Sequence, residues 1–180
     1  MHHEKKLSSK EIFAGRVVRL TVDEVELENG KPAFREVVHH NGGAAVVALN
    51  EKNEVALVRQ FRYAAGRELL EIPAGKVEVG EDPRDTAIRE LGEEAGLAAD
   101  RFAAFGRIIP TCAYCTEVIS LFVGTGLHEV ARHLDADEFV DLVWMPLDEA
   151  VAMVLDGRIE DSKTVAGLLR AQLLQNRGLL

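Results

Sequence analysis

Cysteine, tryptophan and long apolar runs are scarce in this sequence of 180 residues. Its two cysteines, Cys112 and Cys115, are too few for a disulfide-dense secreted scaffold, so a reduced, cytoplasmic setting is expected. No apolar run reaches the roughly 18 residues that a transmembrane helix needs. The segment Met1–Lys10 is charged and lacks the apolar core of a signal peptide. Secretion and membrane insertion are therefore not expected.

Basic residues are also in the minority. The chain has 30 Asp and Glu residues against 21 Lys and Arg residues, and its formal net charge is −9. This sign opposes binding to nucleic acid or to anionic lipid through a basic surface, so neither is an expected partner. A phosphate-bearing ligand would need a metal cation. The apolar fraction of 47% and the charged fraction of 28% are ordinary for a globular protein of one compact domain.

Turn residues and apolar spacing predict a mixture of strands and helices. Two or three strands are expected over Phe13–His40, around an Asn-Gly turn at Asn29, and a hairpin over Ala44–Gln60 is expected to begin the core sheet. Helical spacing predicts helices over Leu147–Leu155 and Lys163–Gln175. The remaining strands are predicted within Leu69–Gly80, Phe102–Ile109, Val118–Gly124 and Val140–Trp144. This mixture predicts an α+β fold or a sheet sandwiched by helices.

A further helix is predicted over Pro83–Ala95. Asp82 suits the N-cap, and proline at the first helical position loses no hydrogen bond. Gly96 can take the left-handed conformation that ends a helix. The helix therefore has a start signal and a stop signal.

One face of this helix is acidic. Glu90 and Glu94 lie one turn apart, and Glu93 lies beside them. Like charges at this spacing weaken an isolated helix unless a cation lies over them. Carboxylate clusters suit Mg²⁺ or Mn²⁺, which take oxygen ligands and bridge to substrate phosphates. Arg89 can pair with Glu93 one turn later, whereas a solvated acidic surface without metal is the alternative.

The residues around this acidic face follow a definite spacing. Gly75 is followed after five residues by Glu81, and after seven more by Arg89-Glu90-Leu91-Gly92-Glu93-Glu94-Ala95-Gly96-Leu97. This pattern resembles the signature of the Nudix hydrolases at its two glycines, four glutamates, arginine and two aliphatic positions. Because it covers only 23 residues, its surroundings matter for the choice of branch.

The flanking segments resemble the ADP-ribose pyrophosphatase branch of that family. Upstream, the similar segments are Val58–Tyr63 and Glu68–Gly75, which ends in Glu-Ile-Pro-Ala-Gly. Downstream, Pro110 and Glu117 bound a loop like the one of that branch, but Thr111-Cys112-Ala113 stands where Ser-Pro-Gly is usual. The substrate within the branch is therefore less well defined than the reaction.

The resemblance implies an α+β fold, an α/β/α sandwich with a mixed β-sheet and the signature as a loop–helix–loop. It implies an N-terminal region of antiparallel strands over residues 1–42, which would serve dimerisation and substrate binding. Residues 43–180 would form the hydrolase domain. The expected assembly is a homodimer whose exchanged N-terminal strands help to bind the nucleotide.

The resemblance also implies roles for single residues. The implied ligands of two or three Mg²⁺ ions, with Mn²⁺ as a possible substitute, are Ala74 through its carbonyl group, Glu90, Glu93 and Glu94. Glu93 or Glu117 would act as the general base. Arg89 would belong to the catalytic residues by supporting the carboxylates of the helix. The expected substrate contacts are Arg35, Arg62 and Glu71. The residues that shape the motif are Gly75, Glu81 and Gly96.

The function implied is Mg²⁺-dependent hydrolysis of the pyrophosphate bond of a nucleoside diphosphate linked to a further group. ADP-ribose would yield AMP and ribose 5-phosphate. Another nucleotide sugar or dinucleotide, such as GDP-mannose or NADH, is an alternative substrate. A module that senses a nucleotide without hydrolysing it is an alternative function.

Overall fold

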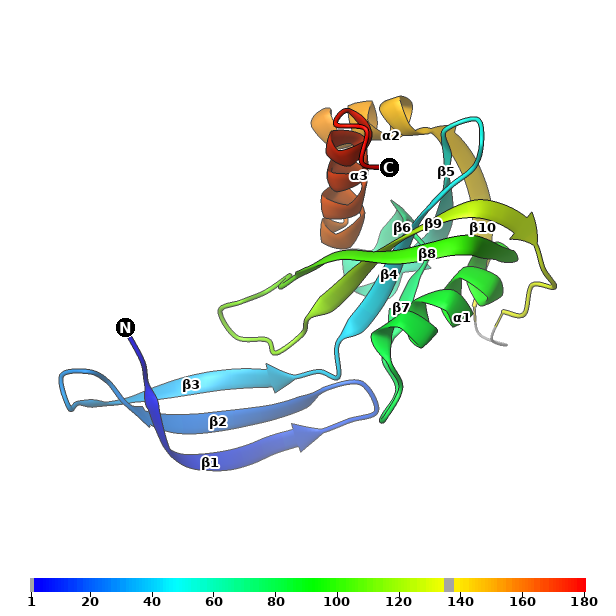
Figure 1. Cartoon of the computed structure of the whole chain (residues 1–180). Coiled ribbons are helices and arrows are strands. Elements are labelled where there is room, and N and C mark those ends of the chain that lie inside the picture. The colour runs from blue at the N-terminus through cyan, green and yellow to red at the C-terminus, as the bar shows by residue number, and fades with distance from the viewer. Residues whose placement is uncertain (1, 135–137) are drawn as a thin grey trace. The chain divides into compact units, whose positions relative to one another are not determined.

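The structure is a computed structural model that describes residues 2–134 and 138–180 (Figure 1). The chain divides into two compact units. The first comprises the chain up to Gly42 together with Ile109–Val118, and the second comprises Gly43–Ile108 and Ile119–Leu180. The segment Ile109–Val118, which the sequence analysis places with the second region, therefore clusters with the first unit.

The first unit contains a three-stranded antiparallel sheet in the order β1-β2-β3 (Figure 1). Its strands are β1 (Lys5–Ala14), β2 (Arg19–Glu26) and β3 (Pro32–His39). The Asn-Gly turn lies between β2 and β3 as predicted, with Gly30 at φ +77°. Most of β1 was not predicted from the sequence. All ten of its residues are exposed, so it has no alternation of buried and exposed positions.

The second unit is built on a mixed seven-stranded sheet. The main strand order is β10-β5-β4-β9-β8, while β6 pairs with β5 and β7 pairs with β4. The pairing of β4 with β9 is parallel, and the other pairings are antiparallel. The strands are β4 (Gly43–Leu49), β5 (Glu54–Arg62), β6 (Arg67–Glu71), β7 (Ala74–Lys76), β8 (Leu97–Ile108), β9 (Ile119–Glu129) and β10 (Val140–Pro146), and a short 3₁₀ helix, Tyr63–Ala65, follows β5.

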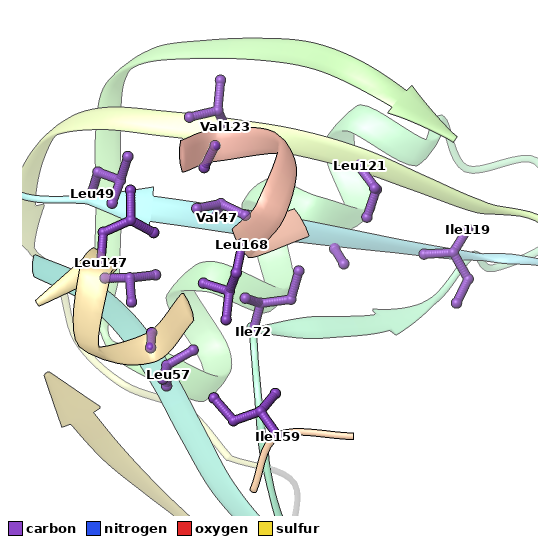
Figure 2. Packing of buried hydrophobic residues seen from close by; sticks show 14 residues of the cluster. Val47, Leu49, Leu57, Ile72, Ile119, Leu121, Val123, Leu147, Ile159 and Leu168 are labelled. Atoms are coloured by element: carbon purple, nitrogen blue, oxygen red, sulfur yellow. The ribbon is translucent and has the colours of Figure 1, made fainter. Parts of the chain in front are cut away.

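Helices cover both faces of this sheet. The helices are α1 (Pro83–Ala95), α2 (Leu147–Leu155) and α3 (Ser162–Gln175). The central strand β4 is buried along its whole length, and its alternating side chains enter two separate cores. Val46 belongs to the core under α1, whereas Val47 belongs to the core under α2 and α3 (Figure 2). The expected α/β/α sandwich is therefore confirmed.

The helix boundaries follow their caps. The Asp82 side chain accepts a hydrogen bond from the N–H of Arg84 at 2.8 Å, and Gly96 ends α1 at φ +67°. Helix α3 begins one residue before the prediction because Asp161 caps it by accepting from the N–H of Thr164 at 3.0 Å. Strand β8 starts directly after the Gly96 cap, five residues before the predicted start at Phe102.

Candidate active site

Strand β7 brings a glycine against a glutamate of α1. Strand β7 pairs with β4, and this pairing places Gly75 opposite Ala44. A Cβ atom on Gly75 would lie 1.7 Å from Glu90 Oε1, which is far inside contact distance. The missing side chain therefore leaves the space that the Glu90 carboxylate fills, and the signature glycine has a direct structural reason.

Arg89 holds three of the signature glutamates. Its Nη1 atom donates to Glu90 Oε1 and to Glu93 Oε2, at 2.8 Å each, while its Nε atom donates to Glu81 Oε1 at 3.1 Å. Hydrogen bonds from Arg89 and from the backbone N–H of Glu78 lower the pKa of Glu81 to about 2. Glu81 therefore stays ionised and fixes the guanidinium group that orients Glu90 and Glu93.

Glu94 is the most deeply buried carboxylate of the helix, at 3% exposure. Its Oε2 atom accepts from the backbone N–H of Ala74 at 2.9 Å, and its Oε1 atom accepts from Gln60 Nε2 at 3.4 Å. Burial raises the pKa of Glu94 to about 7 against the Ala74 hydrogen bond, and the charges of Glu90 and Glu138 raise it further. Burial likewise raises the pKa of Glu90. The site thus concentrates negative charge that its own cations do not fully balance.

A second charged cluster is centred on the buried Glu71. Arg62 donates to both carboxylate oxygens, from Nε and Nη2, at 2.7 Å each. Lys163 Nζ on α3 contacts Glu71 Oε2 and lies 3.0 Å from Asp161 Oδ2. Burial alone would raise the pKa of Glu71, but the hydrogen bonds from Arg62 and the charge of Lys163 outweigh it and lower this pKa.

The donor set fits a hard divalent cation. Glu90, Glu93 and Glu94 offer carboxylate oxygens, which suit Mg²⁺ or Mn²⁺ rather than softer metals. The burial that raises the pKa values of Glu90 and Glu94 disfavours their ionised forms, which a bound cation would stabilise. Among residues 2–134 and 138–180, no three Asp, Glu, His or Cys side chains already converge as a metal cage. Arg89 instead donates to one carboxylate oxygen of Glu90 and one of Glu93.

The expected site residues fall into both units. In the second unit, Arg89 joins Glu81, Glu90 and Glu93, Glu94 meets Ala74, and Arg62 meets Glu71, as described above. In the first unit, Glu117 Oε1 lies 3.5 Å from His40 Nδ1, and Arg35 forms an ion pair with Glu4. The functional roles expected of the residues in both units stay predictions.

Three residues that bear on the site were not predicted from the sequence. Gln60 contacts Glu94, Lys163 contacts Glu71, and the charge of Glu138 raises the pKa of both Glu90 and Glu94. Two signals were present in the sequence. Glu138 ends an acidic run before the predicted strand at Val140, and Lys163 lies in the first turn of a helix, where a cation is unfavourable.

Two family profiles match most of the chain. Residues 39–168 match the NUDIX domain. The chain belongs to the Nudix family. The segment before it, residues 4–38, matches the nucleoside diphosphate sugar hydrolase N-terminal domain. The resemblance inferred from the signature is therefore confirmed, and it extends over the N-terminal strands as well.

Relatives of this Nudix chain match it over most of its length. The chain is 44% identical over 175 residues to a methanol dehydrogenase activator of Bacillus methanolicus, covering 96% of this chain and 95% of the relative. It is 38% identical over 172 residues to an ADP-ribose pyrophosphatase of Bacillus subtilis (strain 168), covering 94% and 93%. The fold resembles the crystal structure of an ADP compounds hydrolase, with a TM-score of 0.84, 20% identity and coverage of 98% and 97%.

Proposed function

We propose that this Nudix protein hydrolyses the pyrophosphate bond of a nucleoside diphosphate linked to a further group, and that ADP-ribose is converted to AMP and ribose 5-phosphate. The observation that carries the proposal is the network of contacts among the signature residues of β7 and α1. Glu90 fills the space above Gly75, Arg89 holds Glu90 beside Glu93, and Glu94 lies buried against Ala74. The relative named ADP-ribose pyrophosphatase supports the choice of substrate.

The site residues prepare an anionic substrate for attack by water. Mg²⁺ or Mn²⁺, held by Glu90, Glu93, Glu94 and the carbonyl group of Ala74, would neutralise the pyrophosphate and acidify the attacking water. Arg89 keeps the first two of these carboxylates side by side through a single nitrogen atom. Because these two carboxylates are already held in place, less entropy is lost when they bind the ion.

Arg62 supplies a fixed cation near the same site. Its side chain is 41% exposed, and the opposite charges of Arg62 and Glu94 affect each other's pKa. A guanidinium group in this position would bind a phosphate oxygen of the substrate.

Three carboxylates are candidates for the base that takes the proton from water. Glu93 and Glu117 follow from the family resemblance, and Glu138 follows from its electrostatic influence on Glu90 and Glu94. We propose that one of them is the base. Glu93→Gln, Glu117→Gln and Glu138→Gln should be compared, because loss of the base removes the acidic limb of the pH profile of kcat.

The decisive test is a product assay with a panel of substrates. The protein would be incubated with Mg²⁺ and, separately, ADP-ribose, GDP-mannose, NADH, diadenosine polyphosphates and nucleoside triphosphates, with EDTA controls. Release of AMP and ribose 5-phosphate, abolished by EDTA, is the expected result. Preferential cleavage of another compound would keep the reaction and change the substrate. Tight binding of ADP-ribose without turnover would instead support a sensing module.

Nicotinamide dinucleotides are the second candidate substrates. The relative named methanol dehydrogenase activator leads to this choice, because nicotinamide cofactors carry hydride for many dehydrogenases. These cofactors contain a pyrophosphate bond between two nucleosides. Cleavage of NADH to AMP and the reduced nicotinamide mononucleotide, faster than cleavage of ADP-ribose, would favour this assignment.

We also propose that the protein is a cytoplasmic homodimer. Leu7, Phe13 and Phe34 of the first unit are 47%, 56% and 69% exposed, and β1 is an edge strand of its sheet. Both cysteines are free thiols, as expected in a reducing compartment. Among the residues that the structure describes, no helix is long and apolar enough to cross a membrane. A protein that is monomeric in light scattering and fully active in the product assay would contradict the dimer.

A further inference from the structure

Lys163 occupies a position that opposes a lysine in two ways. It lies in the first turn of α3, where the helix dipole disfavours a cation, and its side chain is only 10% exposed. Burial of an ammonium group costs free energy unless close anionic partners compensate it. Helix formation therefore does not explain why a lysine stands at this position.

The contacts of Lys163 lead toward the active site. Its Nζ atom contacts Glu71 Oε2, while Arg62 donates to both oxygens of the same carboxylate. Asp161 holds the other side of the ammonium group at 3.0 Å and also caps α3. Glu71, at 1% exposure, is thus held between a buried lysine and a half-exposed arginine.

Arg62 and Lys163 share the single negative charge of Glu71, and Asp161 is a second anionic partner of Lys163. The cluster is therefore balanced as a whole, but the lysine takes up part of the Glu71 charge that would otherwise neutralise the arginine. The bidentate bond still fixes the plane of the guanidinium group. The exposed part of that group is the part available to an anionic ligand.

We propose that Lys163 is a positioning residue for phosphate binding, which acts through Glu71 to fix Arg62 and to leave its positive charge available to the substrate. The inference rests on the proposed function, because it assumes that Arg62 binds a substrate phosphate. Lys163 itself lies behind Glu71 and does not act on the substrate directly. It therefore serves binding of the substrate rather than the chemical step.

The test is a double-mutant cycle between Lys163 and Arg62, measured with Mg²⁺ and ADP-ribose. Lys163→Met should raise KM about tenfold and change kcat less than about twofold, because Arg62 would lose the same binding energy in the ground and transition states. In the background of Arg62→Gln, the second substitution should add no further rise in KM. An equal rise in KM in the wild-type and Arg62→Gln backgrounds, or no rise in KM in either, would overturn the proposal.

Two further variants separate positioning from loss of structure. Leu168→Ala loosens the packing of the same helix without touching the charged cluster, so it should lower the melting temperature and leave KM unchanged. Lys163→Met combined with Glu71→Gln removes the buried charges together and should give a lower KM than Lys163→Met alone. A raised KM in Leu168→Ala, or no recovery in the combined variant, would overturn the proposal.

Failure of the proposed function would give a different experimental result. It would show as absence of turnover by the wild-type protein across the whole substrate panel. The same cycle would then be measured by calorimetry as the affinity for ADP-ribose, with the same expected tenfold weakening. Unchanged affinity in Lys163→Met would reject the role of this lysine independently of catalysis.

Discussion

Glu71 and Glu94 are both almost fully buried, at 1% and 3% exposure, yet their pKa values are shifted in opposite directions. Glu71 has a guanidinium group and an ammonium group within hydrogen-bonding distance. Glu94 has a backbone N–H and the amide of Gln60 as its hydrogen-bond donors, with further carboxylates nearby. Burial is therefore compensated by charge at one glutamate and uncompensated at the other.

The difference indicates where stability and function are located. An ion cluster that satisfies its own charges contributes to the folded structure without a ligand. A carboxylate buried among like charges is costly in the empty protein and becomes favourable when a cation binds. We therefore propose that the Glu71 cluster is a scaffold that positions Arg62, and that the Glu94 cluster is a cation-binding site. Isosteric substitutions at the two positions should separate these roles.

The largest effect is expected from Glu94→Gln. We expect kcat to fall by about 10³-fold, because a neutral amide is a poor ligand for a divalent ion that stabilises the transition state. The melting temperature in EDTA should not decrease, since the amide oxygen can still accept from Ala74 and the buried charge is gone. Steady-state kinetics and thermal melting check both expectations. Loss of stability with retained activity would reverse the comparison.

A smaller loss of activity is expected from Gly75→Ala. The new Cβ atom would overlap with the Glu90 carboxylate, so Glu90 must move away from its place beside Arg89. We expect kcat to fall by about 10²-fold, as for other displacements of a reacting group by about 1 Å. The backbone of Gly75 does not have a positive φ, so the fold should persist in circular dichroism. A wild-type kcat would show that the position of Glu90 is not critical.

The sequence predicted the acidic cluster more completely than the balanced one. Glu81, Arg89, Glu90 and Glu93 lie on or next to one capped helix, where local spacing determines which side chains meet. The Glu71 cluster joins β5, β6 and α3, and Lys163 is 92 residues from Glu71. No local pattern encodes a contact over that separation.

The fold shows the same division between local and distant determinants. The helices were predicted within one residue because their caps are local signals. Strand β1 was largely missed because its partner, rather than its own pattern, makes it a strand. Similarly, Glu138 was missed because its relation to Glu90 and Glu94 depends on a loop between β9 and β10.

Glu71→Gln should mainly affect stability. At pH 7 we expect a loss of about 3 kcal/mol in the free energy of unfolding, because two buried or half-buried cations lose their shared anion. The pKa of Glu71 is lower in the folded than in the unfolded chain, so its contribution is fully present above the unfolded value near 4.5. It is lost as the pH falls through the folded pKa. In urea unfolding from pH 7 to pH 3, the free energies of unfolding of the wild type and Glu71→Gln should approach each other as the pH falls.

The smallest effect is expected from Thr164→Val, which tests the polar support of the Glu71 cluster. The buried Thr164 hydroxyl accepts from the N–H of Ile72 at 2.9 Å and donates to Asp161 Oδ2 at 2.6 Å. Valine keeps the shape but leaves that N–H without its acceptor, so we expect a loss of about 1–2 kcal/mol in urea unfolding. Thr86→Val is the matched control, because Thr86 is equally buried but its hydroxyl interacts with Asp82 O, at 3.4 Å, and with Glu81 rather than with the Glu71 cluster. A loss in Thr86→Val as large as that in Thr164→Val would show that the support of Glu71 is not distinctive.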